Sequence, residues 1–176
     1  MTIHGDHPFL PPEAERSPLR RLRGRMPAPV SVWAATQDGK RAGWTLSSFL
    51  VVEGEPAEVI GIVDEDSPLA DLLTGDGPEP TVVVNILGWS HRALADAFAG
   101  VAPAPGGPFR MNTWVDSSWG PVLADAPAWL GARVRRPIEK AGWGLLVRGL
   151  VEHVEVGTEA GTRLLGYARG RYHSLD

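Results

Sequence analysis

Cysteine is absent from this 176-residue chain, and so is any long apolar run. Without cysteine there are no disulfides, thiolate nucleophiles, iron–sulfur clusters or cysteine-based zinc sites. No stretch approaches the roughly 18 apolar residues of a membrane-spanning helix, and the first fifteen residues lack the apolar segment of a signal peptide. We therefore expect a cytoplasmic protein that makes no membrane contact.

A strong positive charge is also missing. The chain has 17 Lys and Arg against 21 Asp and Glu, a net charge of −4, which argues against a nucleic-acid partner. One basic run, residues 20–25, suits either a solvated segment or a phosphate contact. The sequence has no GxGxxG, P-loop, G-x-S-x-G or H-E-x-x-H motif, and its five histidines are scattered. We expect neither a metal site nor a catalytic triad.

Hydrophobic residues make up 43% of the chain, enough for the core of one domain. Residues 1–24 carry four prolines among charges and predict an N-terminal arm or a poorly ordered tail, followed by a domain over residues 25–176. Segments typical of strands recur between turn residues, at 29–36, 49–54, 57–64, 81–87, 142–156 and 163–172. Residues 121–134 contain two further short strands, around Asp125-Ala126-Pro127.

Turn residues and helix N-cap residues lie between these strands. Asp38-Gly39 predicts a tight hairpin turn, and residues 157–161 predict another turn. Ser67 and Ser90 look like the N-caps of two short helices, over 68–75 and 91–100. Many strands with few short helices predict a mainly β fold, a small β-barrel.

Three polar patches interrupt the apolar pattern. In the first, Gly43 permits close approach of a ligand, and Thr45, Ser47 and Ser48 supply hydroxyls. Such a loop can form an anion cradle from hydroxyls and backbone N–H groups, but serine and threonine are also ordinary turn residues.

In the second patch, Asp64 ends a strand, and Ser67 either caps the next helix or helps to bind a ligand oxygen. In the third, Asn85 lies within an apolar strand, where its amide suits a pyrimidine edge or a backbone edge equally well. His91 and Arg92 stand in the first turn of the following helix, where the dipole does not favour positive charge, which suggests a ligand contact or a solvent-facing pair.

Taken in order, these patches resemble the flavin reductase-like proteins of the FMN-binding split-barrel superfamily. The resemblance covers about residues 26–175. The matching segments are PVSVWAATQDGKRAGWTLSSF, VIGIVDEDSPLADLL, VVVNILGWSHRALADAFAG, GPVLADAPAWLGARV, LLVRGLVEHVEV and LLGYARGRYHSL.

The resemblance implies a homodimer of split β-barrels that binds FMN, or FAD, and transfers hydride from NADH or NADPH to the flavin. A flavin-dependent monooxygenase would use the reduced flavin. No protein residue is required as a general acid or base, so no catalytic residue is assigned. The implied cofactor-binding residues are Gly43, Trp44, Thr45, Leu46, Ser47, Ser48, Asp64, Ser67, Asn85, Leu87, His91 and Arg92. The resemblance places His91 and Arg92 beside the phosphate or the ribityl chain.

On the substrate side the resemblance implies Trp143 and Tyr172. Many members carry Gly-Asp-His where this chain has Gly142-Trp143-Gly144, so an indole replaces an imidazole near the nicotinamide. Two alternatives to a reductase therefore stay open. One is a flavin-binding protein without nicotinamide turnover, and the other is an oxidoreductase of the same barrel type that uses a deazaflavin or another small substrate.

Overall fold

The computed structural model describes residues 17–157 and 163–175. Three α-helices occur in this part of the chain, α1 (Pro18–Arg25), α2 (Pro68–Thr74) and α3 (Arg92–Phe98), with short 3-10 turns at Trp89–His91 and Pro108–Arg110. The strands are β1 (Ala28–Pro29), β2 (Ser31–Gln37), β3 (Lys40–Leu46), β4 (Phe49–Val52), β5 (Glu58–Asp64), β6 (Thr81–Ile86), β7 (Trp114–Ser117), β8 (Gly120–Leu123), β9 (Ala128–Val134), β10 (Glu139–Ala141), β11 (Gly144–Val156), β12 (Leu164–Ala168) and β13 (Arg171–Leu175).

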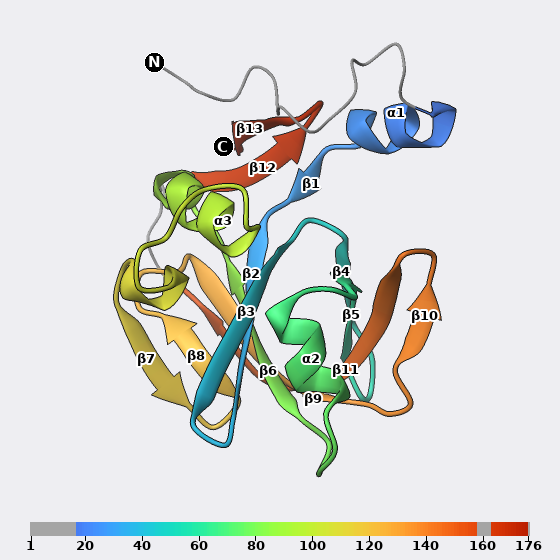
Figure 1. Cartoon of the computed structure of the whole chain (residues 1–176), viewed down its shortest axis with the longest axis vertical. Coiled ribbons are helices and arrows are strands. Elements are labelled where there is room, and N and C mark those ends of the chain that lie inside the picture. Colours follow the sequence, from blue (N-terminus) through green and yellow to red (C-terminus); the bar gives the residue numbers. More distant parts are fainter. Residues whose placement is uncertain (1–16, 158–162, 176) are drawn as a thin grey trace.

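One antiparallel sheet dominates the fold, with the strand order β3-β2-β6-β9-β11-β5-β4 and with β10 paired to β11 (Figure 1). The chain passes from β3, at one edge of this sheet, directly into β4, at the other edge. At the bend between them, the N–H of Ile62 donates to the carbonyl of Ser48 at 2.9 Å. The two edges therefore approach each other and curl the sheet into a barrel that stays open beside α2.

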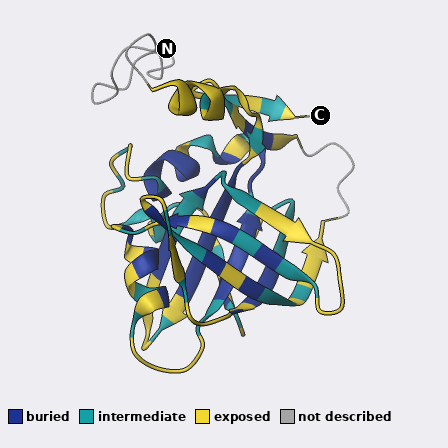
Figure 2. Cartoon of the chain, turned by 90° about the vertical axis from the view of Figure 1, so that its right-hand side faces the viewer, coloured by how far each residue is buried: buried dark blue, intermediate teal, exposed yellow. Residues whose placement is uncertain are grey.

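Two small sheets complete the structure: a β7–β8 hairpin and a sheet of order β1-β12-β13. Two buried clusters support these layers (Figure 2). The first fills the barrel around Trp33, which is fully buried and lies against Gly61, where a Cβ would come within 2.7 Å of the indole. The second joins the barrel to α3 and to the C-terminal hairpin through Leu94, Phe98 and Leu165. The apolar residues of the sequence thus form two buried clusters rather than one core.

Most local predictions are confirmed. Asp38 and Gly39 form the β2–β3 turn with φ values of 50° and 74°, as a turn with two left-handed residues requires. Ser67 caps α2, Pro68 is its first residue, and Gly75 follows its last. The strand predicted over 81–87 is β6, and its central residues are buried, so both of its faces are covered.

Two local predictions are wrong. Ser90 does not cap a helix, because it lies inside a 3-10 turn and α3 starts two residues later with His91 at its N-cap position. The strand predicted over 163–172 is a hairpin, because the chain turns at Arg169 and Gly170, which both have positive φ. Strands β7 and β10 are not among the predicted strands. The turn predicted at 157–161 lies almost entirely outside the described residues.

The predicted N-terminal arm is described only from Ser17 onward, so most of residues 1–24 lies outside the structure. Where it is described, the chain is helical, and Ser17 caps α1 by accepting the N–H of Arg20. The N–H of Arg169 donates to the carbonyl of Gly24 at 2.6 Å and ties α1 to the β12–β13 turn. Within residues 17–157 and 163–175, no helix is long and apolar enough to cross a membrane.

Close packing of α3 on β3 generates a prediction about Gly43. A Cβ at this position would lie 2.7 Å from Cε1 of Phe98, whose side chain is buried. We expect Gly43→Ala to lower the free energy of unfolding by about 1–3 kcal/mol through overpacking, measured by urea unfolding. Gly24→Ala is the control, because a Cβ there has no neighbour within 4 Å among the described residues. An unchanged midpoint for Gly43→Ala would contradict this account.

Candidate functional site

The bend between β3 and β4 carries the two serines of the first patch. Ser47 and Ser48 are half-buried, and the Ser48 hydroxyl accepts a hydrogen bond from Nη2 of Arg23 in α1 at 3.2 Å. The Ser47 hydroxyl has no hydrogen bond to any residue that the structure describes. This short segment therefore presents hydroxyls and a cation side by side, a combination that suits an anionic oxygen ligand.

The preceding residues of the patch face the protein rather than a ligand. The Thr45 hydroxyl donates to the carbonyl of Ala95 in α3 at 2.8 Å. Leu46 is buried in the barrel, Trp44 is half-buried against the same cluster, and the space that Gly43 leaves is filled by Phe98. These four residues set the position of the bend, and the ligand contacts implied for them stay predictions.

The second patch lies beside the bend along β5. The Asp64 carboxylate accepts the N–H of Asp66 at 2.9 Å. The buried Ser67 hydroxyl donates to the carbonyl of Asp64 at 2.7 Å and accepts the N–H of Ala70 at 3.1 Å. Ser67 thus fulfils the capping alternative, and its hydroxyl proton is already engaged. Asp64 is exposed and accessible to solvent.

Trp143 occupies the tip of the β10–β11 hairpin, after Gly142 with a φ of 62°. Its side chain is 94% exposed, an unusual state for an indole. Gly144 pairs with Asp64 in the β11–β5 ladder, so the tip lies next to the second patch. Because β5 also contacts Ser48, the bend, Asp64 and the Trp143 tip belong to one region of the barrel.

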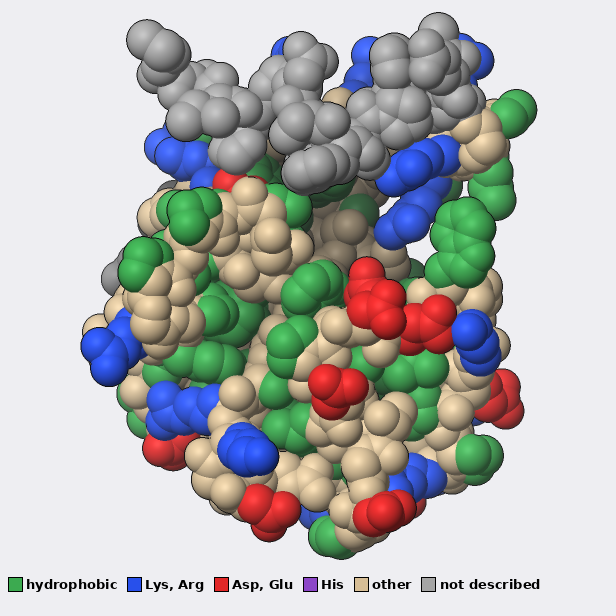
Figure 3. All heavy atoms as spheres, in the orientation of Figure 1, with side chains coloured by type: hydrophobic (Ala, Val, Ile, Leu, Met, Phe, Trp, Pro, Cys, Tyr) green, Lys and Arg blue, Asp and Glu red, His purple; other side chains and the backbone are tan. Residues whose placement is uncertain are grey.

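Charges in this region are divided between two places. The loop after β5 is acidic, with Asp64, Glu65 and Asp66, and Lys140 forms an ion pair with Glu65 at 2.8 Å. The cations lie on α1. Figure 3 shows Lys and Arg side chains gathered near the upper edge, where Figure 1 places α1, with acidic side chains below them. An anionic group is therefore favoured at the α1 side and disfavoured at the β5 loop.

The third patch is used inside the protein. Both Asn85 N–H groups are engaged, since Nδ2 lies 3.3 Å from the carbonyls of Val32 and Pro121, and Oδ1 accepts the N–H of Leu123 at 2.8 Å. Asn85 thus takes the backbone-edge alternative and joins β6 to β2 and β8. Leu87 is fully buried, its N–H donates to the carbonyl of Val30, and its carbonyl accepts the N–H of Leu165. Neither residue has a free donor for a flavin.

His91 and Arg92 also turn away from the bend. The buried His91 ring accepts the N–H of Gly88 at Nδ1, 3.0 Å away. Its Nε2 lies 3.1 Å from the Asp125 carboxylate, close enough for a charge contact but outside hydrogen-bond alignment. The Arg92 guanidinium stacks 3.9 Å from the ring centroid of Trp89 and donates to the carbonyl of that residue. The contact with the flavin phosphate or ribityl chain that the resemblance implies for this pair stays a prediction.

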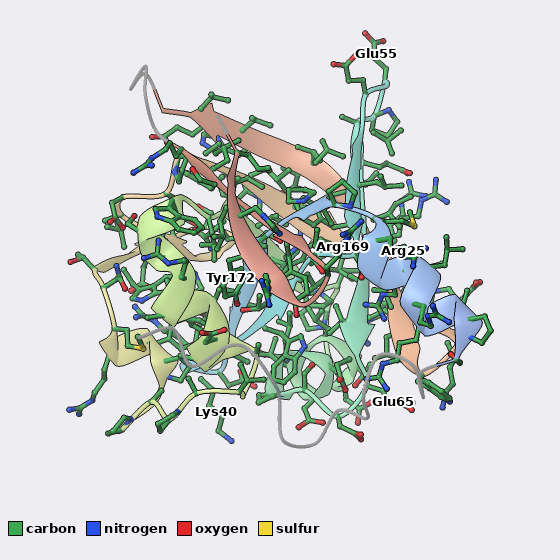
Figure 4. The ribbon with its side chains drawn as sticks, turned by 90° about the horizontal axis from the view of Figure 1, so that it is seen from above. Arg25, Lys40, Glu55, Glu65, Arg169 and Tyr172 are labelled. Atoms are coloured by element: carbon green, nitrogen blue, oxygen red, sulfur yellow. The ribbon has the colours of Figure 1, made fainter. Side chains whose placement is uncertain are left out.

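Tyr172 is held by α3. Its hydroxyl donates to Oδ1 of Asp96 at 2.8 Å, and its ring packs against Tyr167 and the second buried cluster. Burial raises the pKa of the Tyr172 phenol well above its usual range, and the hydrogen bond to Asp96 raises it further. Figure 4 shows Tyr172 close to the middle of the molecule when it is seen from above. The substrate-side role implied for Tyr172 stays a prediction.

A surface hollow of about 460 Å³ lies elsewhere, between the β2–β3 and β7–β8 hairpins. Thr36, Thr81 and the Arg41–Asp116 ion pair, 2.7 Å long, contribute to its lining. None of the implied cofactor-binding residues lines this hollow, so the candidate site remains the region around the bend.

The curled antiparallel sheet, open beside α2 and carrying hydroxyls at its closing bend, is a split β-barrel of the FMN-binding type. The model of the flavin reductase like domain family matches residues 23–176, and the chain belongs to this family. The chain is 28% identical to the FMN reductase (NADH) RutF of Ancylobacter novellus over 165 residues, which cover 93% of this chain and 87% of the relative.

Two further proteins are similar over nearly the whole chain. The FMN reductase (NADH) RutF of Variovorax paradoxus is 26% identical over 166 residues, covering 94% of this chain and 88% of that one. The NADH:FAD oxidoreductase SgcE6 of Streptomyces globisporus C-1027, solved with NAD and FAD fragments, superposes with a TM-score of 0.77 at 25% identity. That match covers 93% of this chain and 94% of the solved chain.

Sequence reasoning left one residue of this region unassigned. Arg23 belongs to the basic run over 20–25, and the sequence alone could not say whether that run is solvated or contacts phosphate. The helix and the hydrogen bond to Ser48 place it at the bend.

The raised pKa of Tyr172 predicts a pH dependence of stability. The folded-state pKa lies above the unfolded value of about 10, so this phenol contributes stability that is complete below pH 10 and is lost as the pH rises above it. We expect Tyr172→Phe to have an unfolding free energy about 1 kcal/mol below that of the wild type at pH 7. Between about pH 9 and 11, the unfolding free energy of the variant should fall less than that of the wild type, because the variant lacks the phenol. Chemical unfolding across this pH range measures both effects.

Tyr167→Phe is the matched control, since it removes a phenol but keeps the Tyr172–Asp96 hydrogen bond. It should keep the alkaline loss of stability. An identical pH profile for wild type and Tyr172→Phe would show that the Tyr172 phenol does not carry the effect.

Proposed function

We propose that the chain is an NADH:flavin oxidoreductase that binds FMN, with FAD as the alternative, and reduces it with NADH. The full-length likeness to reductases carries this proposal. The FMN reductase (NADH) RutF of Ancylobacter novellus covers 93% of the chain, and the NADH:FAD oxidoreductase SgcE6 has the same barrel. The cytoplasm, where reduced nicotinamide is available, is the compartment that this function requires.

The residues around the bend fit a flavin nucleotide by their donor chemistry. Ser47 and Ser48 offer hydroxyls, Arg23 offers a guanidinium, and the exposed Trp143 indole offers an aromatic face. A flavin, when bound, supplies the hydride-accepting chemistry, which no protein side chain can provide. The chain's own contribution is to bind and orient two planar rings, and this needs no acid or base residue.

The second candidate is a flavin-binding protein without nicotinamide turnover. Trp143 favours it, because an indole that stands 94% exposed beside the site could cover the face where a nicotinamide would stack. In the reductase, reduced flavin would leave for, or be consumed by, a partner monooxygenase. If the chain were instead an oxidoreductase that uses a deazaflavin, the deazaflavin would bind at the same bend.

Anaerobic addition of NADH tests the proposed function. We expect the flavin absorption bands to bleach within seconds when NADH is mixed with the protein and FMN, at a rate that exceeds the protein-free rate by orders of magnitude. NADPH is tested in parallel. Flavin binding without bleaching by either nucleotide would favour the second candidate, and absence of flavin binding would contradict both.

The double variant Ser47→Ala/Ser48→Ala locates the flavin in the same experiment. Each hydroxyl contact contributes about 0.5–1.5 kcal/mol, so we expect FMN affinity to fall about tenfold or more. Ser118→Ala is the control, since Ser118 lines the distant hollow between the hairpins and should leave FMN affinity unchanged. Equal affinity of the double variant and the wild type would place the flavin away from the bend.

We also propose that the chain forms a homodimer through β4. This strand is one of the two edges of the large sheet, and Leu50, Val51 and Val52 expose 66, 54 and 42% of their surface. Figure 4 shows Glu55 at the tip of the β4–β5 hairpin, which stands out from the body. An exposed apolar edge invites aggregation unless a partner covers it, and a second copy is the partner that the family resemblance implies.

Light scattering after gel filtration tests the dimer. We expect the wild type to have twice the 18.9 kDa mass of one chain, and Leu50→Glu/Val52→Glu to elute as a folded monomer because charges at the contact repel and stay hydrated. Val115→Glu, at a similarly exposed valine on β7, should stay dimeric. A monomeric wild type, or a double variant that stays dimeric, would contradict the assignment of β4.

A further inference from the structure

Helix α1 concentrates positive charge beside the bend. It has arginine at positions 20, 21, 23 and 25 of an eight-residue helix, without an acidic residue in its first turn. All four side chains are exposed, and none forms an ion pair with a described residue. The helix is nonetheless held in place, since Gly24 bonds to Arg169 and Arg23 bonds to Ser48.

Arg23 is the member of this group that points at the candidate site. Its Nη2 lies 3.2 Å from the Ser48 hydroxyl oxygen, and this contact joins α1 to the segment that closes the barrel. A neutral hydroxyl satisfies one donor of a guanidinium that has five, and it leaves the charge uncompensated. Within the described residues, the guanidinium is positioned but not neutralised.

The other cations near the candidate site contact residues outside the bend. His91 is buried against Gly88 and Asp125, Arg92 stacks on Trp89, and Lys140 pairs with Glu65. The loop after β5 contributes carboxylates instead, so a phosphate at that loop would meet repulsion. The charge distribution therefore leaves the α1 side of the bend as the place for a negatively charged group.

A phosphate ester matches what Arg23 and Ser48 offer together. The planar guanidinium can donate two N–H groups to two phosphate oxygens, and the serine hydroxyl can rotate to donate to a third. Such charge-assisted hydrogen bonds are about twice as strong as neutral ones. The same pair offers little to a flavin that lacks phosphate.

We infer that Arg23 and Ser48 bind the phosphate of the flavin nucleotide, and that Arg23 makes the chain select phosphorylated flavin over riboflavin. This inference rests on the proposed function. It assigns to α1 the role that the sequence resemblance had suggested for His91 and Arg92.

Equilibrium binding of FMN and riboflavin, followed by flavin fluorescence, tests the inference without any turnover. We expect the wild type to bind FMN at least tenfold more tightly than riboflavin. Arg23→Ala should weaken FMN binding about tenfold and leave riboflavin binding unchanged, and Arg23→Lys should recover part of the loss. Rising salt should weaken FMN binding less in Arg23→Ala than in the wild type.

Arg21→Ala is the matched control. It removes the same charge from the same helix on a different face, without touching Ser48, and should bind both flavins like the wild type. Circular dichroism checks that all variants keep the fold. An Arg23→Ala variant that binds FMN normally, or that loses FMN and riboflavin equally, overturns the inference while the proposed function stands. A wild type that binds neither flavin overturns both.

Discussion

The backbone pairing of β5 is the constraint on which the candidate site depends. On one side, Ile62 bonds to Ser48 and closes the barrel at the β3–β4 bend. On the other side, Asp64 pairs with Gly144 and brings the Trp143 tip alongside. Because side chains alternate along a strand, a shift of this register by one residue would turn the apolar face of β5 out of the core. The packed interior around Trp33 thus also fixes the positions of the site residues.

Electrostatics in this region arise from segments that are distant in the sequence. The acidic loop after β5 and the basic helix α1 are about forty residues apart, yet the barrel closure brings both beside the bend. Separating the two signs allows one side to receive an anion while the other repels it. The division also accounts for the presence of hydroxyls at the bend, since they can donate to an anion without adding net charge.

Several polar residues that drew attention in the sequence have structural roles. Asn85 satisfies three backbone groups of the surrounding strands, Ser67 caps α2, and His91 braces the turn before α3. A buried polar group costs free energy unless it is hydrogen-bonded, so each of them had to find partners. Whether those partners are backbone groups or a ligand depends on which atoms the fold brings within about 3 Å, and the sequence does not contain that information.

The sequence by itself determined the mainly β fold, the Asp38-Gly39 turn and the Ser67-Pro68 start of α2, because these follow from dihedral preferences and apolar periodicity of neighbouring residues. It also indicated the family, through the order of its patches. Only the tertiary structure decided that the C-terminal segment is a hairpin, that Asn85 and His91 are occupied internally, and that Arg23 reaches Ser48. The Asn85 and Arg23 contacts join residues 25 or more positions apart, and local preferences do not fix which distant groups meet. The C-terminal turn is local, but it needs a positive φ at Arg169, a residue type that does not indicate a turn.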